Sequence, residues 1–444
     1  MSEVMRSEAG TSRLSVIWSN LRDPAARLRN VDRLAILIAI LLPWTTTGVG
    51  IAVVLWLIAL VPTIEPRALL QSSKRPACAL PVALFALALA GMLWSDASSH
   101  DRMHQLSQIG KFLALPLLIY HFERSQRGMA VFTAFLISCA LLAVVSCIVA
   151  LDPILSAKLY FSRGPFLPTS GIFVKNYIDQ GQEFSLCAVA LAYPVVTSLR
   201  EGQTKRALWL APIAVALVAN MMFVVTSRTA LVTMPIMLVI FLLLHLRWQV
   251  AIAAIIAAAL LIAATWYASP HLRTTVGKFF IDYRETMIQN NESGMGSRLI
   301  YWGKSLQFFA EAPLIGHGTG STRGLFEKAA AGEIGAKALI VSDPHNQTLN
   351  VAVQWGTVGV ILLYAMWLSH LALFREEGLV NWIGLLVVIQ NMLTSLLNSH
   401  LFDFNEGWIY VLGVGIAGGT TLARRLTPRV LAAAGSAPAP RSQP

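Results

Sequence analysis

Long, nearly uninterrupted apolar runs dominate this sequence and decide what the chain can fold into. A helix needs about 20 mostly apolar residues to cross the hydrocarbon core of a bilayer. The run from Leu34 to Val61 is too long for one ordinary helix, and its centre, Pro43-Trp44-Thr45-Thr46-Thr47-Gly48, predicts a hairpin of two short helices. Further runs lie at 77–94, 107–122, 129–150, 182–199, 207–225, 230–246, 249–267, 349–373, 379–398 and 408–423. The sequence therefore predicts an all-α polytopic membrane protein with about twelve transmembrane helices.

The composition excludes several other classes of protein. Only 13% of the 444 residues are charged and 56% are hydrophobic, whereas soluble domains carry about 25% charged residues. An outer-membrane barrel is excluded as well, because its strands alternate apolar and polar residues. The formal net charge of +11 is compatible with nucleic-acid binding, but in a membrane protein excess Lys and Arg sets topology and contacts anionic lipids. We therefore expect membrane lipids as partners and no nucleic acid.

The distribution of Lys and Arg predicts the orientation. With the N-terminus inside, the cations collect in the inner loops and the short outer loops hold few, as the positive-inside rule requires. The inner set comprises the arm 1–33, Arg67, Lys74, Arg75, Arg124, Arg127, Arg200, Lys205, Arg206, Arg247, Arg375 and the tail 425–444. The arm has no short apolar core with a cleavage site, so it is not a signal peptide. Both termini are predicted to be cytoplasmic.

Between the arm and the tail, the prediction places helices 1–9 in residues 34–267 and helices 10–12 in residues 349–424. The outer segment between them, 268–348, is too long for a structureless connection. Its amphipathic stretches at 273–289 and 297–310 predict helices of its own. A large helical loop of this kind, between spans 9 and 10, is a candidate functional region.

Three ionisable residues at the outer ends of helices are the main candidates for chemistry. Arg228 stands between the seventh and eighth spans, where a charge near the membrane is a functional hypothesis by default. Arg298 begins an amphipathic helix, where a cation opposes the helix dipole unless an anion compensates it. His345 precedes the tenth span, and His is the usual side chain for proton transfer near neutral pH. Each also has a structural interpretation, as a snorkelling, solvated or capping residue.

Three further cations are weaker candidates: Lys111 in the fourth span, and Arg163 and Lys175 in the first outer loop. The sequence lacks Walker A, His-Glu-x-x-His and Gly-x-Ser-x-Gly motifs, and no outer loop carries an Asp-x-Asp pair. The missing motifs remove ATP hydrolysis, zincin proteolysis and the serine-hydrolase elbow, and a metal-dependent diphosphate site would have to be assembled from scattered carboxylates. No metal site and no cofactor are assigned from the sequence.

Together, these cations and the histidine suit a lipid-linked diphosphate at the outer membrane face. Arginine offers forked donors to phosphate oxygens. If a sugar is attached, the diphosphate is a leaving group whose growing charge the cations stabilise. A nearby His would deprotonate the attacking hydroxyl.

Several segments resemble the O-antigen ligase family, within the ligase/polymerase superfamily of bacterial polysaccharide glycosyltransferases. The matching blocks are Ser227-Arg228-Thr229, Arg298 with Trp302, Pro313-Leu314-Ile315-Gly316-His317-Gly318, His345-Asn346, and Trp355-Gly356-Thr357-Val358-Gly359. His317 departs from the family pattern, in which an apolar residue stands between the two glycines.

The resemblance implies a multi-pass enzyme of the bacterial inner membrane with a periplasmic active site. Such enzymes transfer a glycan from undecaprenyl diphosphate to lipid A–core oligosaccharide, completing lipopolysaccharide, by metal-independent inverting transfer. By analogy, Arg228 and Arg298 bind the diphosphate, with Lys175, Arg163 and Lys111 as further diphosphate-binding candidates, and His345 is catalytic.

Other functions stay open at this stage. An O-antigen polymerase shares the donor chemistry, but the Arg-to-Gly spacing of eleven residues often seen in such polymerases is missing after Arg163, Arg228 and Arg298. A protein O-oligosaccharyltransferase usually has a longer C-terminal region. A twelve-span transporter or flippase would place its charges near the bilayer midplane. The sugars at the two ends of the bond and the oligomeric state are not specified by the sequence.

Overall fold

The computed structural model describes residues 23–152, 171–172, 174–225, 227–268 and 270–435, and these form helices without any strand. The first half of the chain forms α2 (Pro24–Leu41), α3 (Thr46–Leu60), η1 (Val61–Thr63), α4 (Pro66–Ser73), α5 (Pro76–Gly91), α6 (Ser99–Gly110), η2 (Lys111–Leu113), α7 (Ala114–Phe122), α8 (Gly128–Leu151), α10 (Tyr177–Arg200) and α11 (Thr204–Phe223). The second half forms α12 (Arg228–His245), α13 (Trp248–Ala268), α14 (Pro270–Gln289), α15 (Gly294–Glu311), α16 (Thr322–Ala330), η3 (Gly335–Ala338), α17 (Gln347–Leu373), α18 (Leu379–Thr394) and α19 (Phe404–Gly435).

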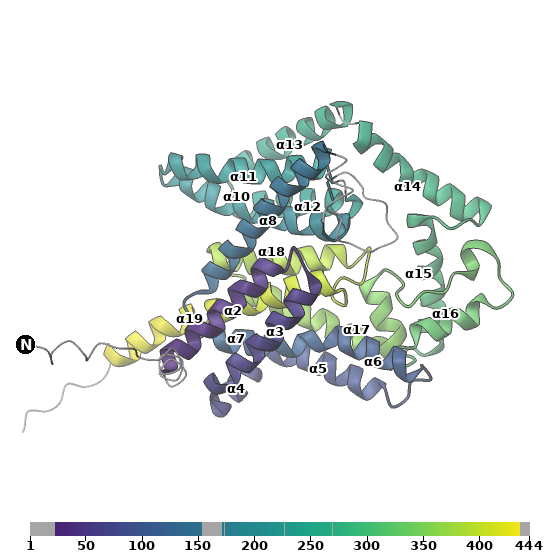
Figure 1. The fold of residues 1–444 in the computed structure, drawn as a ribbon, viewed down its shortest axis with the longest axis horizontal. Coiled ribbons are helices and arrows are strands. Elements are labelled where there is room, and N and C mark those ends of the chain that lie inside the picture. The colour runs from purple at the N-terminus through teal and green to yellow at the C-terminus, as the bar shows by residue number, and fades with distance from the viewer. Residues whose placement is uncertain (1–22, 153–170, 173, 226, 269, 436–444) are drawn as a thin grey trace, which may run out of the picture.

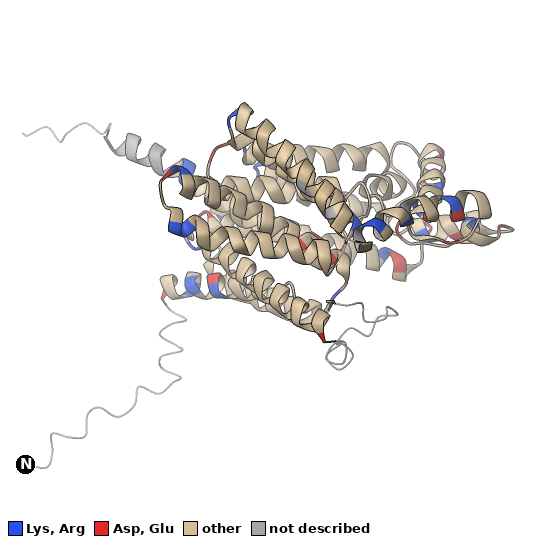
Figure 2. Ribbon diagram, turned by 90° about the horizontal axis from the view of Figure 1, so that it is seen from above, with Lys and Arg blue, Asp and Glu red and all other residues tan. Residues whose placement is uncertain are grey.

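The helices are those of a membrane protein. By length and hydropathy, 7 helices of the described part qualify as spans, or up to 8 if α4 and α5, bent by 86°, form one broken span. The seven are α3 with η1, α8, α10, α11, α12, α13 and α17. Charged residues lie mostly toward the helix ends, which leaves long uncharged stretches between them (Figure 2). A polytopic all-α fold is thus established, while the expected total of about twelve spans stays a prediction.

The predicted hairpin at 34–61 corresponds to α2 and α3. The Thr45 side chain accepts the Gly48 N–H at 3.2 Å and caps α3. The indole N–H of Trp44 donates to Ser138 Oγ at 2.8 Å and ties the turn to α8. α2 begins earlier than expected, at Pro24, because the Asp23 carboxylate accepts the N–H groups of Ala25 and Ala26.

The apolar run at 107–122 is not one uniform helix. Ser98 accepts the Asp101 N–H and starts α6, a polar helix that runs to Gly110. A 3₁₀ turn, η2, follows at Lys111 before α7. Short 3₁₀ segments inside helices often mark functional positions, and here the break falls on a candidate residue.

The long segment 268–348 does contain helices of its own. α14 and α15 correspond to the predicted stretches at 273–289 and 297–310. Together with α16 they form a lobe beyond the ends of the helix bundle (Figure 1). α15 packs against α17, which in turn packs against α5 in the bundle.

A break in α17 joins this lobe to the bundle. Gly356 has φ of 62° and ψ of −157°, which interrupts the helix. The loop around Pro313 enters the gap: Thr357 N–H donates to Pro313 O at 2.8 Å and Val358 N–H donates to Leu314 O at 3.2 Å. The sequence blocks 313–318 and 355–359 are therefore two halves of one backbone-paired junction.

Replacing Gly356 by Ala should destabilise the protein by about 1–3 kcal/mol, because a left-handed φ is strained for an L residue and the new Cβ would overlap the backbone of Leu314. The measurement is thermal unfolding in detergent. Gly303→Ala in α15 is the matched control, since a Cβ there meets open space. Equal melting temperatures for Gly356→Ala and the control would show that the junction does not stabilise the fold.

Candidate functional site

Arg228 stands at the start of α12 and connects this helix to the lobe. The Ser227 hydroxyl accepts the Ala230 N–H and caps α12 directly before it. The Arg228 guanidinium donates to the Asp282 carboxylate of α14 at 2.7 Å. The same carboxylate oxygen accepts the Met295 N–H at 3.2 Å. Asp282 therefore orients Arg228 and fixes the start of α15 at the same time.

Arg298 reaches from α15 to the turn between α18 and α19, residues 395–403, called here the 395–403 turn. Its guanidinium donates to Leu397 O at 2.7 Å. Burial lowers the pKa of Arg298, Tyr177 and Asp343 oppose that shift, and the charge of Arg228 adds to it. Asp343 and Arg228 thus shift the pKa of Arg298 in opposite directions, because the charges of the three groups interact.

His345 is held in an uncommon backbone conformation directly before α17. Its φ is 55°, and its N–H donates to the Asp343 carboxylate at 2.9 Å. Its ring Nδ1 lies 2.5 Å from Asn398 Oδ1. Local Asp-to-backbone bonds of this kind stabilise tight turns, so the His345 backbone is fixed from within its own loop.

Asn398 sets the tautomer of His345. The amide nitrogen of Asn398 donates to the Asp403 carboxylate at 3.2 Å, which leaves its oxygen facing the imidazole. An amide oxygen only accepts hydrogen bonds, so Nδ1 carries the proton and Nε2 is the basic nitrogen. The arrangement prepares His345 to accept a proton at Nε2.

Asp343 organises the other side of this loop. It accepts the Ser399 hydroxyl at 2.6 Å and the Asn350 side-chain amide at 3.2 Å, besides the His345 N–H. Burial raises the pKa of Asp343, and His345 and Ser399 partly oppose this shift. Sequence reasoning did not single out Asp343, Asn398 or Ser399 as site residues, although an Asp two residues before His345 is a recognisable turn signal.

The weaker cation candidates lie in other surroundings. The Lys175 ammonium donates to Leu42 O and Asn405 Oδ1 and lies 3.8 Å from the Glu183 carboxylate. The Lys111 ammonium donates to Phe402 O at 3.0 Å and also to Asp403 O. Both ammonium groups are thus held by groups of the protein itself. Arg163 lies outside the described residues.

A compact cluster at the end of the 395–403 turn bears on the expectation of no metal. His400, Asp403 and Glu406 bring potential ligand atoms within 4.8 Å of one another. Burial lowers the pKa of His400, but Glu406 and Asp403 outweigh it and raise the pKa to about 10. The two carboxylates thus favour a proton on His400, and a metal ion would have to displace that proton to bind the imidazole. The absence of a metal requirement stays a prediction.

Arg228, Arg298 and His345 lie within a segment that a family model matches. Residues 213–364, from α11 to α17, match the model described as O-antigen ligase. The match covers about a third of the chain, and in this segment the chain is similar to the O-antigen ligase family. No curated protein matches the chain. The O-antigen ligase segment contains Arg228, Arg298 and His345, whereas Lys111, Lys175 and the 395–403 turn lie outside it.

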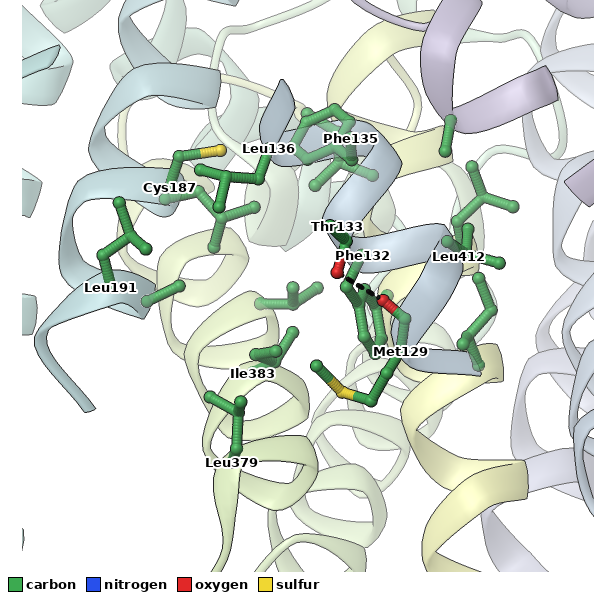
Figure 3. A pocket seen from close by; sticks show the side chains of 18 of the residues that line it. Met129, Phe132, Thr133, Phe135, Leu136, Cys187, Leu191, Leu379, Ile383 and Leu412 are labelled. Atoms are coloured by element: carbon green, nitrogen blue, oxygen red, sulfur yellow. Dashed lines mark hydrogen bonds between the residues drawn. The ribbon is translucent and has the colours of Figure 1, made fainter. Parts of the chain in front are cut away.

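An apolar cavity of about 270 Å³ lies in the bundle, and Arg228, Arg298 and His345 are not among the residues that line it. Side chains of α2, α8, α10, α11, α18 and α19 line it, including Leu136, Leu191 and Ile383 (Figure 3). The Thr133 hydroxyl at its wall is already bonded to Met129 O at 2.9 Å (Figure 3). The cavity suits hydrocarbon and offers little for transfer chemistry.

Proposed function

We propose that this protein is an O-antigen ligase that transfers a glycan from undecaprenyl diphosphate to lipid A–core oligosaccharide, completing lipopolysaccharide. The reaction would take place at the periplasmic face of a bacterial inner membrane, with both termini cytoplasmic. One observation carries the proposal: Arg228 reaches the start of α15 through Asp282, and Arg298 of α15 and His345 contact neighbouring residues, Leu397 and Asn398, of the 395–403 turn. All three residues lie within the matched segment.

The two arginines would bind the donor diphosphate. A guanidinium has five N–H donors in a fixed fork. Arg228 uses one nitrogen on Asp282 and Arg298 uses one on Leu397 O. Further N–H groups of these guanidinium groups would donate to the phosphate oxygens, and the contacts with Asp282 and Leu397 O orient both side chains before the donor binds. Charge that grows on the departing diphosphate is then stabilised without reorganisation of the protein.

His345 would act as the general base. The acceptor hydroxyl oxygen attacks the anomeric carbon and passes its proton to Nε2, while the bond from that carbon to the diphosphate oxygen breaks. The diphosphate leaves with the electron pair. A single displacement of this kind inverts the anomeric configuration. The chemistry needs positioned charges and one base, and we propose that neither a metal nor a cofactor takes part.

Transfer by the purified protein tests the proposal directly. A lipid-linked glycan is offered with lipid A–core and, separately, with a second lipid-linked glycan as acceptor. We expect lipid A–core to gain the glycan, as measured by the shift of the product on a gel and by mass spectrometry. Extension of the second lipid-linked glycan instead would identify a polymerase, and absence of transfer to either acceptor would favour a transporter.

His345→Ala should lower the transfer rate by about 10²–10⁴-fold, the usual contribution of a positioned general base. The protein should still insert into the membrane and keep its melting temperature within a few degrees. His100→Ala is the matched control, because His100 is exposed on α6. Normal transfer by His345→Ala would remove this residue from the mechanism.

Arg228→Lys and Arg298→Lys should each raise the KM for the donor by about ten- to a hundredfold. Lysine keeps the charge but lacks the fork, and one charged hydrogen bond contributes about 1.5–3 kcal/mol. Initial rates at varied donor concentration measure the effect. Arg323→Lys, on the exposed face of α16, should leave the KM unchanged. An unaltered donor KM in both site variants would contradict diphosphate recognition by these arginines.

A further inference from the structure

A second cavity, of about 640 Å³, adjoins the 395–403 turn. The turn contacts His345 through Asn398, whereas Phe402 and Asp403 line the cavity. The other walls come from α3, α6, η2, α7 and the start of α19. Its volume lies within the range of pockets that bind small ligands, about 300–1,000 Å³.

The polar wall of this cavity is one face of α6 and η2. His104, Ser107, Gln108 and Lys111 all line it, and their spacing of three, four and seven residues places them on one side of a helix. Asp403 adds a carboxylate. An apolar wall lies opposite, formed by aliphatic side chains of α3 and α7 with Phe404 and Trp408.

The cation in this cavity is built into the protein. Lys111 is 9% exposed, and its ammonium donates to Phe402 O and Asp403 O. Gly407 leaves the space that the Lys111 side chain occupies, since a Cβ there would overlap the ammonium group. Two carbonyl partners and the nearby Asp403 carboxylate offset its charge, so the cavity is a poor site for a diphosphate and suits a neutral, hydroxyl-rich ligand.

We infer that this cavity binds a sugar unit of a membrane-anchored glycolipid. Sugars present hydroxyl groups that amide, hydroxyl and carboxylate side chains bond, and apolar C–H faces that pack on aromatic rings such as those of Phe404 and Trp408. A chain of hydrogen bonds also links the wall of the cavity to the proposed reaction site. Asp403, in its wall, accepts from Asn398 at 3.2 Å, and Asn398 contacts His345 Nδ1 at 2.5 Å.

The inference rests on the proposed transfer reaction and deepens it. The bound sugar belongs either to the acceptor oligosaccharide or to the donor glycan, and both present the same chemistry. In either case Lys111 serves a saccharide site and does not bind the donor diphosphate.

Two glycines allow the cavity to be filled without disturbing the fold. Gly50 in α3 and Gly110 at the end of α6 both line the cavity, and a Cβ at either position meets no atom within 4 Å. Gly110 has φ of −56°, which any residue adopts. We expect Gly50→Leu and Gly110→Leu to raise the KM for one of the two glycolipids by about tenfold or more. A single side-chain group that obstructs a binding pocket typically weakens binding by this factor. Gly324→Leu in α16 is the matched control, because a Cβ there also meets no neighbour.

A second variant separates a sugar from a hydrocarbon chain. Gln108→Leu keeps the approximate size of the side chain but removes its hydrogen bonds, so it should raise the same KM if the ligand is a sugar. A change in the acceptor KM identifies the acceptor as the source, and a change in the donor KM identifies the donor. Unchanged KM values for both glycolipids in Gly50→Leu and Gly110→Leu would overturn the inference. A raised KM in these two variants but not in Gln108→Leu would overturn it as well, because the ligand would then not be a sugar. Absence of transfer by the unaltered protein would instead refute the proposed function itself.

Discussion

Hydrogen bonds to the 395–403 turn hold together the elements on which the candidate site depends. Its carbonyl oxygens accept from Arg298 of α15 and from Lys111 of η2, and its side chains hold His345. Residues separated by almost 300 positions in sequence thereby meet at one short connection. A turn can do this because some of its carbonyls, such as Leu397 O, lie outside the regular backbone bonding of a helix and can accept side-chain donors.

The junction between α17 and the Pro313 loop gives the site its second fixed boundary. The break at Gly356 frees backbone groups within a helix, and the loop satisfies them: His317 N–H donates to Val353 O at 2.9 Å and Gly318 N–H donates to Gln354 O at 2.8 Å. The lobe that carries Asp282 and Arg298 is therefore anchored to the same helix that follows His345. Backbone pairing of this kind keeps the arginines and the histidine in a constant relation.

The described ionisable groups fall into two classes. Some lie beside an acidic partner within the protein: His121 Nε2 lies 2.9 Å from Asp32, Lys175 lies 3.8 Å from Glu183, and His400 faces two carboxylates. Such buried pairs orient helices but leave little capacity for a ligand. Arg298 differs, because its guanidinium donates to a neutral backbone oxygen, Leu397 O, at 2.7 Å, whereas Arg228 is ion-paired with Asp282 at 2.7 Å. The two proposed diphosphate-binding arginines are therefore held differently, one by a backbone oxygen and one by a carboxylate.

Local sequence properties determined the helical class, the hairpin of α2 and α3, the apolar helices α8 and α10 to α13, and the helices of the segment 268–348. Hydropathy and capping act over one or two turns, so these elements could be read without tertiary information. The same reading selected Arg228 and His345 beside apolar runs, and Arg298 as a cation at the start of an amphipathic helix. Only the tertiary structure decided what those residues contact. It gave Lys111 and Lys175 partners within the protein, divided the run at 107–122 into α6, η2 and α7, and brought Asn398 to His345 across 53 positions. Such contacts depend on how distant helices pack, and no local pattern encodes that packing.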